Sequence, residues 1–325
     1  MQKFMTKKVR EMEIDDAVEG FFLMKNPALK TTQTGKNLLS FKLADASGEI
    51  EAVFWDYDGN LHETGAGKPV KIRGTISDYN GKKQLTVQQI RLAKEGDPVD
   101  LNTLVPSAPI DPKQTYTMMV NLIESIRDPE YKNICVEMLA RNRDMICCMP
   151  AAKSVHHAFR YGLLMHTYFM MCHADHMACF YPFVDRDLLL TGTFCHDLAK
   201  AKEFSLSPAG LVTDYSVPGH LLGHLYMGAA DIGNVCREIG VSEEKSMLLQ
   251  HMLLSHHGKP EFGAAVAPKT AEAMLLSMID DLDAKMETIR ETLDGRPVGL
   301  TDSVWALGYR LYNHGATISA EQSQN

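Results

Sequence analysis

Histidine is concentrated in one part of this chain, and this concentration constrains the fold more than any other feature of the sequence. Eleven of the thirteen histidines lie between His156 and His257, where an even spread over 325 residues would place about four. From about Gln114 onward, apolar residues recur at helical spacing. These histidines can share one site only if several helices bring them together. The C-terminal part is therefore predicted to be a helical domain built around a shared site.

The central motif is the run from Thr193 to Lys200, in which a histidine directly precedes an aspartate at the end of an apolar stretch. Neighbouring side chains on a helix point about 100° apart, so His196 and Asp197 can reach one pocket without occupying the same spot. This arrangement suits an imidazole and a carboxylate that share a metal ion. A single His-Asp pair also occurs by chance, and the prediction therefore depends on the histidines around it.

Further candidate ligands follow in order along the predicted helices. They are His166, His224, His256, His257 and Asp280. Two of these choices stay open: His220 competes with His224, and Asp281 and Asp283 compete with Asp280. His224 is preferred because an apolar helical face follows it. Imidazole together with carboxylate favours Mn, Fe, Co or Zn over Mg, which prefers oxygen ligands.

The order His…His-Asp…His…His-His…Asp resembles the HD phosphohydrolase superfamily in its two-metal form. By this resemblance the ligands of one ion are His166, His196, Asp197 and Asp280. Those added for a second ion are His224, His256 and His257. The carboxylate of Asp197 would bridge the two ions. Two ions roughly 3.5–4 Å apart activate a water and stabilise an in-line attack on a phosphodiester.

Basic residues near these ligands are candidates for holding a substrate phosphate. Lys200 closes the central motif and would act as a point charge, although a solvated lysine at a helix end is the alternative. His157 and Arg160 precede the first ligand, and an arginine can bind two phosphate oxygens at once. His156 is a candidate for the same reason. Asp197, Lys200, Arg160 and His157 are therefore the predicted catalytic residues.

Residues 16–93 alternate apolar and polar side chains in five short segments, which predicts β-strands. The dipeptide Asn80-Gly81 predicts a two-residue hairpin turn. Five strands of this spacing resemble an OB-fold, a small barrel whose sheet face often binds oligonucleotides. Such barrels bind single strands through a basic groove with aromatic platforms for the bases. The candidate contacts are Trp55, Tyr57, Lys42 and Arg73, although aromatic residues of a small barrel are more often part of its core.

The predicted fold class is an N-terminal all-β OB-fold barrel followed by a C-terminal all-α HD-domain helical fold. The barrel domain covers residues 1–95 and the helical domain residues 114–325, while Gly96 and four prolines in residues 96–113 indicate a linker. The net charge is −8, but residues 1–100 hold fifteen basic and fifteen acidic side chains. All the excess acid therefore lies in the helical part, and the neutral barrel is free to carry a basic face.

Seven cysteines without a CxxC pair favour reduced thiols in a cytoplasm. No apolar run reaches the roughly 18 residues of a membrane helix, and the N-terminus lacks the apolar core of a signal peptide. The expected location is therefore cytoplasmic, with no membrane partner.

An OB-fold followed by a two-metal HD domain resembles the YhaM family of bacterial 3′–5′ exoribonucleases, and the run from Pro150 to Arg160 carries the same resemblance. The resemblance implies hydrolysis of single-stranded RNA, and sometimes single-stranded DNA, to nucleoside monophosphates. It also implies two divalent ions, with Mn preferred. Two alternatives stay open: an HD phosphohydrolase that acts on a small nucleotide second messenger, and a non-catalytic single-strand-binding protein. The sequence leaves a homo-oligomer open.

Overall fold

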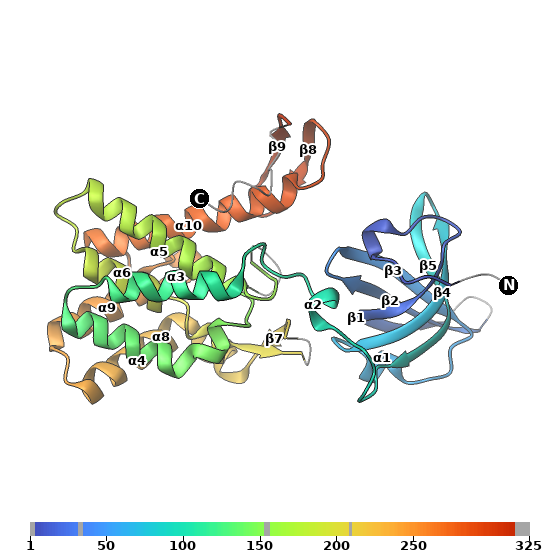
Figure 1. Ribbon diagram of the computed structural model, residues 1–325, viewed down its shortest axis with the longest axis horizontal. Helices are drawn as coiled ribbons and strands as arrows, with labels where there is room; N and C mark the ends of the chain where they lie inside the picture. The colour runs from blue at the N-terminus through green and yellow to red at the C-terminus, as the bar shows by residue number, and fades with distance from the viewer. Residues whose placement is uncertain (1–3, 32–34, 153–156, 208–209, 316–325) are drawn as a thin grey trace.

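The computed structural model describes residues 4–31, 35–152, 157–207 and 210–315. Within these ranges the chain forms a β-barrel and a helical domain, joined by a segment that carries a short helix (Figure 1). The predicted class, a β-barrel followed by a helical domain, is confirmed. Among the described residues, no helix has both the length and the apolar character needed to span a membrane.

Five strands close the barrel in the order β1-β2-β3-β5-β4. They are β1 (Ala17–Thr31), β2 (Asn37–Asp45), β3 (Gly48–Trp55), β4 (Pro69–Tyr79) and β5 (Lys82–Leu92). Two short helices accompany them, η1 (Val9–Glu11) and α1 (Leu61–Thr64). Alternate side chains point inward, and Phe22 and Phe41 are among the largest in the core. The predicted Asn80-Gly81 turn joins β4 to β5, with both residues at positive φ.

The segment between the two domains contains the helix α2 (Leu101–Leu104). The surrounding prolines predict an irregular linker, so this helix is a difference from the expectation. Leu104 and Val105 are buried in an apolar cluster with Leu23 and Ala44 of the barrel. Leu211 of the helical domain packs against the same cluster. The cluster therefore holds the segment on the barrel and also connects the barrel to the helical domain.

The helices of the C-terminal domain surround one apolar core. In chain order they are α3 (Pro112–Glu124), α4 (Pro129–Ile146), α5 (Gly162–Phe180), α6 (Arg186–Cys195), α7 (Lys200–Glu203), α8 (Val217–Ile239), α9 (Glu243–Ser255), η2 (Pro260–Phe262) and α10 (Ala271–Leu293). Aspartate side chains fix the starts of three of them. Asp111, Asp128 and Asp185 accept hydrogen bonds from the first free backbone N–H groups of α3, α4 and α6.

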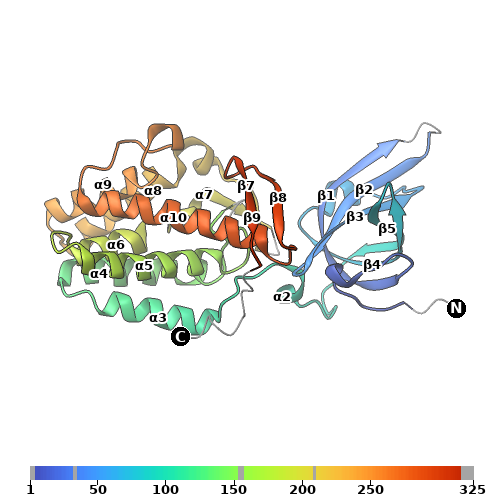
Figure 2. The same ribbon diagram turned by 90° about the horizontal axis from the view of Figure 1, so that it is seen from above.

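Two short hairpins interrupt the helical pattern. They are β6 (Phe204–Leu206) with β7 (Val212–Tyr215), and β8 (Gly299–Val304) with β9 (Tyr309–Asn313). The sequence pattern predicts a loop in place of the β6–β7 hairpin and indicates no strand at β8 or β9. Strands β7, β8 and β9 are mostly exposed, so they lack the alternation of a half-buried strand. The first hairpin lies on the side of the helical domain toward the barrel, and the second extends from the end of α10 (Figure 1, Figure 2).

Candidate metal centre

Five helices or helix ends bring the seven predicted ligands together inside the helical domain. The contributors are α5 (His166), the end of α6 (His196 and Asp197), α8 (His224), the end of α9 (His256 and His257) and α10 (Asp280). Five of these residues are less than a tenth exposed, and the other two, His257 and Asp280, are partly exposed. The cluster is therefore shielded from water on most sides and open on one.

Asp197 lies in the middle of the cluster, with its two carboxylate oxygens facing different ligand sets. Oδ2 lies 3.3 Å from His196 Nε2 and 3.5 Å from His166 Nε2. Oδ1 lies 3.4 Å from His224 Nε2 and 3.8 Å from His256 Nε2. Donor atoms that share one cation at about 2.1 Å lie roughly 3.0–3.4 Å apart. These spacings fit two neighbouring cation sites that share Asp197.

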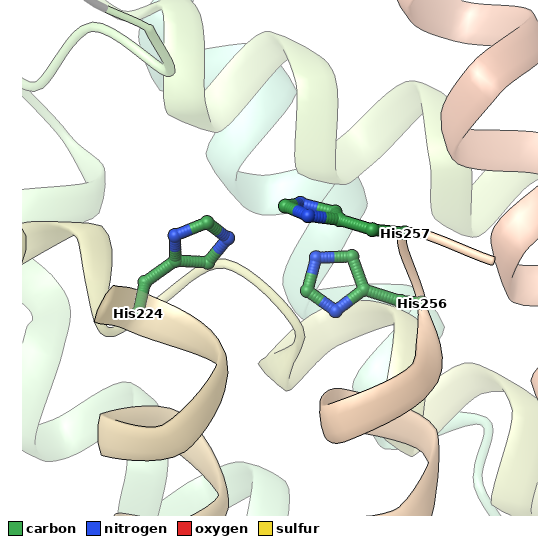
Figure 3. A group of neighbouring side chains, drawn as sticks. All are labelled: His224, His256 and His257. Carbon is green, nitrogen blue, oxygen red and sulfur yellow. The ribbon is translucent and has the colours of Figure 1, made fainter. Parts of the chain in front are cut away.

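Three buried polar atoms at this point have no hydrogen-bond partner among the described residues. They are Asp197 Oδ1, His224 Nε2 and His256 Nε2. An unsatisfied buried polar group costs about 1–3 kcal/mol, so three of them at one place indicate a site built for a ligand. The ring of His257 lies beside those of His224 and His256, and the three turn toward one another (Figure 3). A divalent cation would satisfy all of these atoms, and the donor set therefore fits one.

Hydrogen bonds of the outer ring nitrogens fix which nitrogen faces the cluster. In three of the ligand histidines Nδ1 lies 2.7–2.8 Å from a backbone carbonyl oxygen: His196 with Thr193, His256 with Leu253, and His257 with Phe262. A carbonyl oxygen only accepts hydrogen bonds, so each Nδ1 carries the proton and donates it. Each Nε2 is then left with an inward lone pair, as a metal ligand requires. Burial and neighbouring imidazoles lower the pKa of His256 and His257, which keeps both rings neutral.

The two aspartates of α10 approach His166 from opposite sides of its ring. Asp280 Oδ1 lies 3.4 Å from Nε2, among the ligand atoms, whereas Asp283 Oδ2 lies 2.7 Å from Nδ1. The same Asp283 oxygen lies 2.8 Å from His157 Nε2. Asp280 therefore lies among the candidate ligand atoms, while Asp283 contacts the opposite ring nitrogen of His166 and can orient the ring from behind. Burial lowers the pKa of His166, but hydrogen bonds to Asp197, Asp280 and Asp283 outweigh burial and raise it well above its ordinary value.

Glu203 orients His224 in a similar way. Its Oε1 accepts hydrogen bonds from the backbone N–H of His224 at 3.0 Å and from Nδ1 at 2.9 Å. Gly223 permits this approach, because its φ of 71° and ψ of 161° interrupt α8 in a conformation that favours glycine. Burial alone would raise the pKa of Glu203, but the bonds from His224 lower it overall, so the side chain is a carboxylate. The competing candidate His220 is exposed, and its ring packs against Tyr215.

Substitution of Glu203 with glutamine is expected to weaken cation binding on the His224 side of the cluster by about 10–100-fold, because the carboxylate behind a ligand histidine loses its charge. Titration calorimetry with Mn²⁺ should show one weakened binding event and one that keeps its affinity. Asp283→Asn is the matched variant, since it removes the corresponding charge behind His166 and should weaken the other event. Unchanged affinities in Glu203→Gln would contradict this role.

Lys200 lies against Asp197 at the edge of the cluster. Its Nζ is 2.6 Å from Asp197 Oδ2, and the side chain is largely buried. Burial lowers the pKa of Lys200, but Asp197 outweighs burial and raises it, so the ammonium is charged. A cavity of about 400 Å³ opens here, and its lining includes Lys200, His224, His257, Tyr215, Leu222 and Phe262. The cavity connects the ligand cluster with the surface.

The other two basic candidates do not face this cavity in the way the sequence predicts. His157 is fully buried against Asp283, and so it supports His166 instead of standing beside a phosphate. The guanidinium of Arg160 lies over the ring of Tyr161 at 4.7 Å, and its backbone pairs with Pro106 and Ala108. Residues 153–156 of the same run, including His156, lie outside the described residues.

The two aromatic candidates of the barrel differ in burial. Trp55 is 50% exposed at the end of β3, so its ring is available to a ligand. Tyr57 belongs to the barrel core, and its hydroxyl accepts a hydrogen bond from the backbone N–H of Leu61. In a regular strand, Trp55 and Tyr57 would face the same side. Asp56 lies between them with a φ of 53°, and this left-handed conformation turns the two side chains to different sides. Tyr57 is therefore largely buried, unlike the exposed stacking platform that the sequence predicts.

The two basic candidates of the barrel are partly exposed and paired with acids. Lys42 Nζ lies 3.4 Å from a Glu49 carboxylate oxygen. Arg73 donates two hydrogen bonds to Glu19, at 2.9 and 2.6 Å, and its guanidinium lies 4.5 Å from the ring centre of Phe4. Surface ion pairs contribute about 0–1 kcal/mol, so a phosphate can replace the acid at small cost.

Among solved structures, similar chains are the OB domain of Ta0387 from Thermoplasma acidophilum, the second OB-fold domain of replication protein A from Methanococcus maripaludis, and the replication factor A related protein from Methanobacterium thermoautotrophicum. In that order they are 15, 16 and 22% identical to this chain, with TM-scores of 0.24, 0.21 and 0.22. The matches cover 29, 28 and 30% of this chain and 92, 98 and 94% of the other chains.

Two family models match separate parts of the chain. The model described as an HD domain matches residues 163–285, a range that contains all seven candidate ligands. The model described as an OB-fold nucleic acid binding domain matches residues 24–93, from within β1 to the end of β5. The chain therefore contains an N-terminal OB-fold barrel followed by a helical HD domain, whose buried histidines and aspartates are suited to divalent cations.

Proposed function

We propose that this chain is a cation-dependent 3′–5′ exonuclease of the YhaM type, which shortens single-stranded RNA, and also single-stranded DNA, by releasing nucleoside monophosphates. The observation that carries the proposal is the position of Asp197 between two sets of ligand histidines. A shared carboxylate of this kind supports hydrolysis of phosphodiesters. The OB-fold domain in the same chain supports a single strand as substrate, in preference to a small nucleotide.

The chain's own residues would position the substrate and the ligands. When bound, a pair of divalent cations supplies water activation and neutralises charge on the phosphate. Lys200 is charged and lines the cavity, which supports a role in holding a phosphate oxygen as a point charge. Asp283 and Glu203 hold two of the ligand rings with Nε2 inward. His157 acts from behind Asp283 as a positioning residue.

Trp55→Ala is expected to weaken binding of single-stranded RNA by about tenfold, because stacking on one aromatic ring contributes about 1–3 kcal/mol per base. Fluorescence anisotropy with a labelled oligonucleotide measures this affinity, in the presence of a chelator that prevents degradation. Phe180→Ala is the matched control, since Phe180 is another exposed aromatic side chain, 72% exposed, and lies at the end of α5 in the helical domain. Equal affinity of wild type and Trp55→Ala would exclude Trp55 from the binding surface.

Incubation of the full chain and Mn²⁺ with RNA labelled at its 5′ end tests the proposed activity directly. The expected result is progressive shortening of the labelled strand together with release of nucleoside monophosphates. Intact RNA alongside hydrolysis of a cyclic dinucleotide or an alarmone would instead support a small-nucleotide phosphohydrolase. Intact RNA that stays bound, with no product from either substrate, would support a non-catalytic binding protein. Either of these results overturns the proposal.

A further inference from the structure

The cavity beside the ligand cluster has two kinds of wall. Its inner wall carries Lys200, His224 and His257. Its outer wall carries three apolar side chains that are 39, 53 and 68% exposed: Tyr215, Leu222 and Phe262. None of these three belongs to an apolar core cluster of the described residues. These three exposed side chains around the entrance, which we call the apolar rim, therefore lie outside the apolar cores of the two domains.

The apolar rim is fixed relative to the ligands. The backbone carbonyl of Phe262 accepts the hydrogen bond from His257 Nδ1 at 2.8 Å, so the residue that carries this ring also orients a ligand. Leu222 directly precedes Gly223, whose non-helical backbone turns the chain before His224. On the β6–β7 hairpin, the Tyr215 ring packs against that of Phe204, with ring centres 5.4 Å apart. The position of the rim is therefore set by the same local structures that set the cluster.

We propose that Phe262 and Tyr215, with Leu222 beside them, form a stacking site for the base of the 3′-terminal nucleotide. This inference rests on the proposed function and assigns the residues that hold the end of the strand. The cavity, at about 400 Å³, lies within the range of roughly 300–1,000 Å³ of small-ligand sites. A nucleotide matches its two walls, because the phosphate is anionic and every base has an apolar π-face.

The composition of the cavity wall also indicates which bases the site accepts. Among the described residues that line it, side chains able to form hydrogen bonds are Lys200, Glu203, Tyr215, His224 and His257. Of these, His224 and His257 are candidate ligands, and Lys200 and Glu203 are bonded to candidate ligands. Strong discrimination between bases needs several fixed donors and acceptors at the base edge. Stacking on Tyr215 and Phe262 uses the base faces, which all four bases share, so all four should be removed at similar rates, with purines favoured slightly by their larger rings.

The test is Phe262→Ala, assayed on RNAs that end in each of the four bases and on one that ends in an abasic nucleotide. For the four natural ends kcat/KM should fall by about tenfold, mainly through KM, because one stacking contact is lost. For the abasic end the loss should be clearly smaller, since there is no base to stack. Cation affinity measured by calorimetry should be retained, because alanine keeps the backbone carbonyl that binds His257.

Phe180→Ala is the matched control, because Phe180 is a similarly exposed phenylalanine that does not line the cavity; this variant should trim every RNA at the wild-type rate. Equal losses on abasic and natural ends would show that Phe262 has a structural role and would overturn the inference. So would an unchanged kcat/KM on the natural ends. If wild-type protein shortens none of these RNAs, the proposed function itself fails, and the stacking site falls with it.

Discussion

Replacement of Asp197 with asparagine should lower the rate of RNA shortening about a thousandfold or more, which corresponds to roughly 4 kcal/mol of lost transition-state stabilisation. The reason is geometric. Oδ2 of Asp197 faces His196 and His166, and Oδ1 faces His224, so one substitution weakens both cation sites. Single-turnover measurements on 5′-labelled RNA at saturating Mn²⁺ separate this loss of chemistry from any change in strand binding.

The same substitution tests the fold, because Asp197 also neutralises Lys200 in a largely buried ion pair. Removal of one partner of a buried pair costs about 3–5 kcal/mol, so a lower melting temperature with an unchanged circular dichroism spectrum is expected. Asp231→Asn is the matched control, since Asp231 pairs with Lys202 near the surface, where a pair contributes about 0–1 kcal/mol. A folded Asp197→Asn variant that shortens RNA at the wild-type rate would disprove the role of the shared carboxylate.

Removal of divalent cations with a chelator should abolish RNA shortening completely and leave RNA binding in place. Under the proposed function, cleavage requires the ligand cluster of the HD domain, whereas the OB-fold domain holds the strand. Its candidate contact Trp55 is an exposed side chain outside the cluster. Addition of Mn²⁺ should restore the rate. The assay compares product formation and fluorescence anisotropy on the same oligonucleotide, with and without the chelator.

Chelation should also lower the melting temperature. A cation that binds the folded state at a hundred times its Kd stabilises that state by about 2.7 kcal/mol, and it also satisfies the buried atoms Asp197 Oδ1, His224 Nε2 and His256 Nε2. The Asp197→Asn variant supplies the comparison, since its melting temperature should respond far less to Mn²⁺. Full activity in the chelated protein would argue against cation sites in this cluster. So would a wild-type melting temperature that does not change when Mn²⁺ is added.

The sequence could predict that the seven candidate ligands gather at one place, and the structure brings them together. Their chemistry restricts them to histidine and aspartate, and their order along the helices is readable without coordinates. Helical spacing alone does not separate Asp280 from Asp283, because residues three apart lie on the same face of a helix; the sequence favours Asp280 only through the resemblance to the HD superfamily. The rotation of α10 decides it: Asp280 faces Nε2 of His166 and Asp283 faces Nδ1.

The sequence does not predict contacts that depend on a local change in backbone conformation. Glu203 orients His224 only because Gly223 leaves the helical conformation, and a sequence pattern does not reveal this change. In the barrel, a left-handed Asp56 alters the alternation that the strand pattern implies, so Trp55 is exposed while Tyr57 enters the core. The barrel itself was predictable because its strands are half-buried and alternate regularly, unlike the mostly exposed strands β8 and β9.

The most direct test of the two-cation cluster is anomalous X-ray diffraction from crystals of the Mn²⁺-loaded wild-type protein, recorded at the manganese absorption edge. Two peaks are expected, one on each side of the Asp197 carboxylate. One peak should lie among His166, His196 and Asp280, and the other among His224, His256 and His257. A single peak, or no peak at these side chains, would contradict the account.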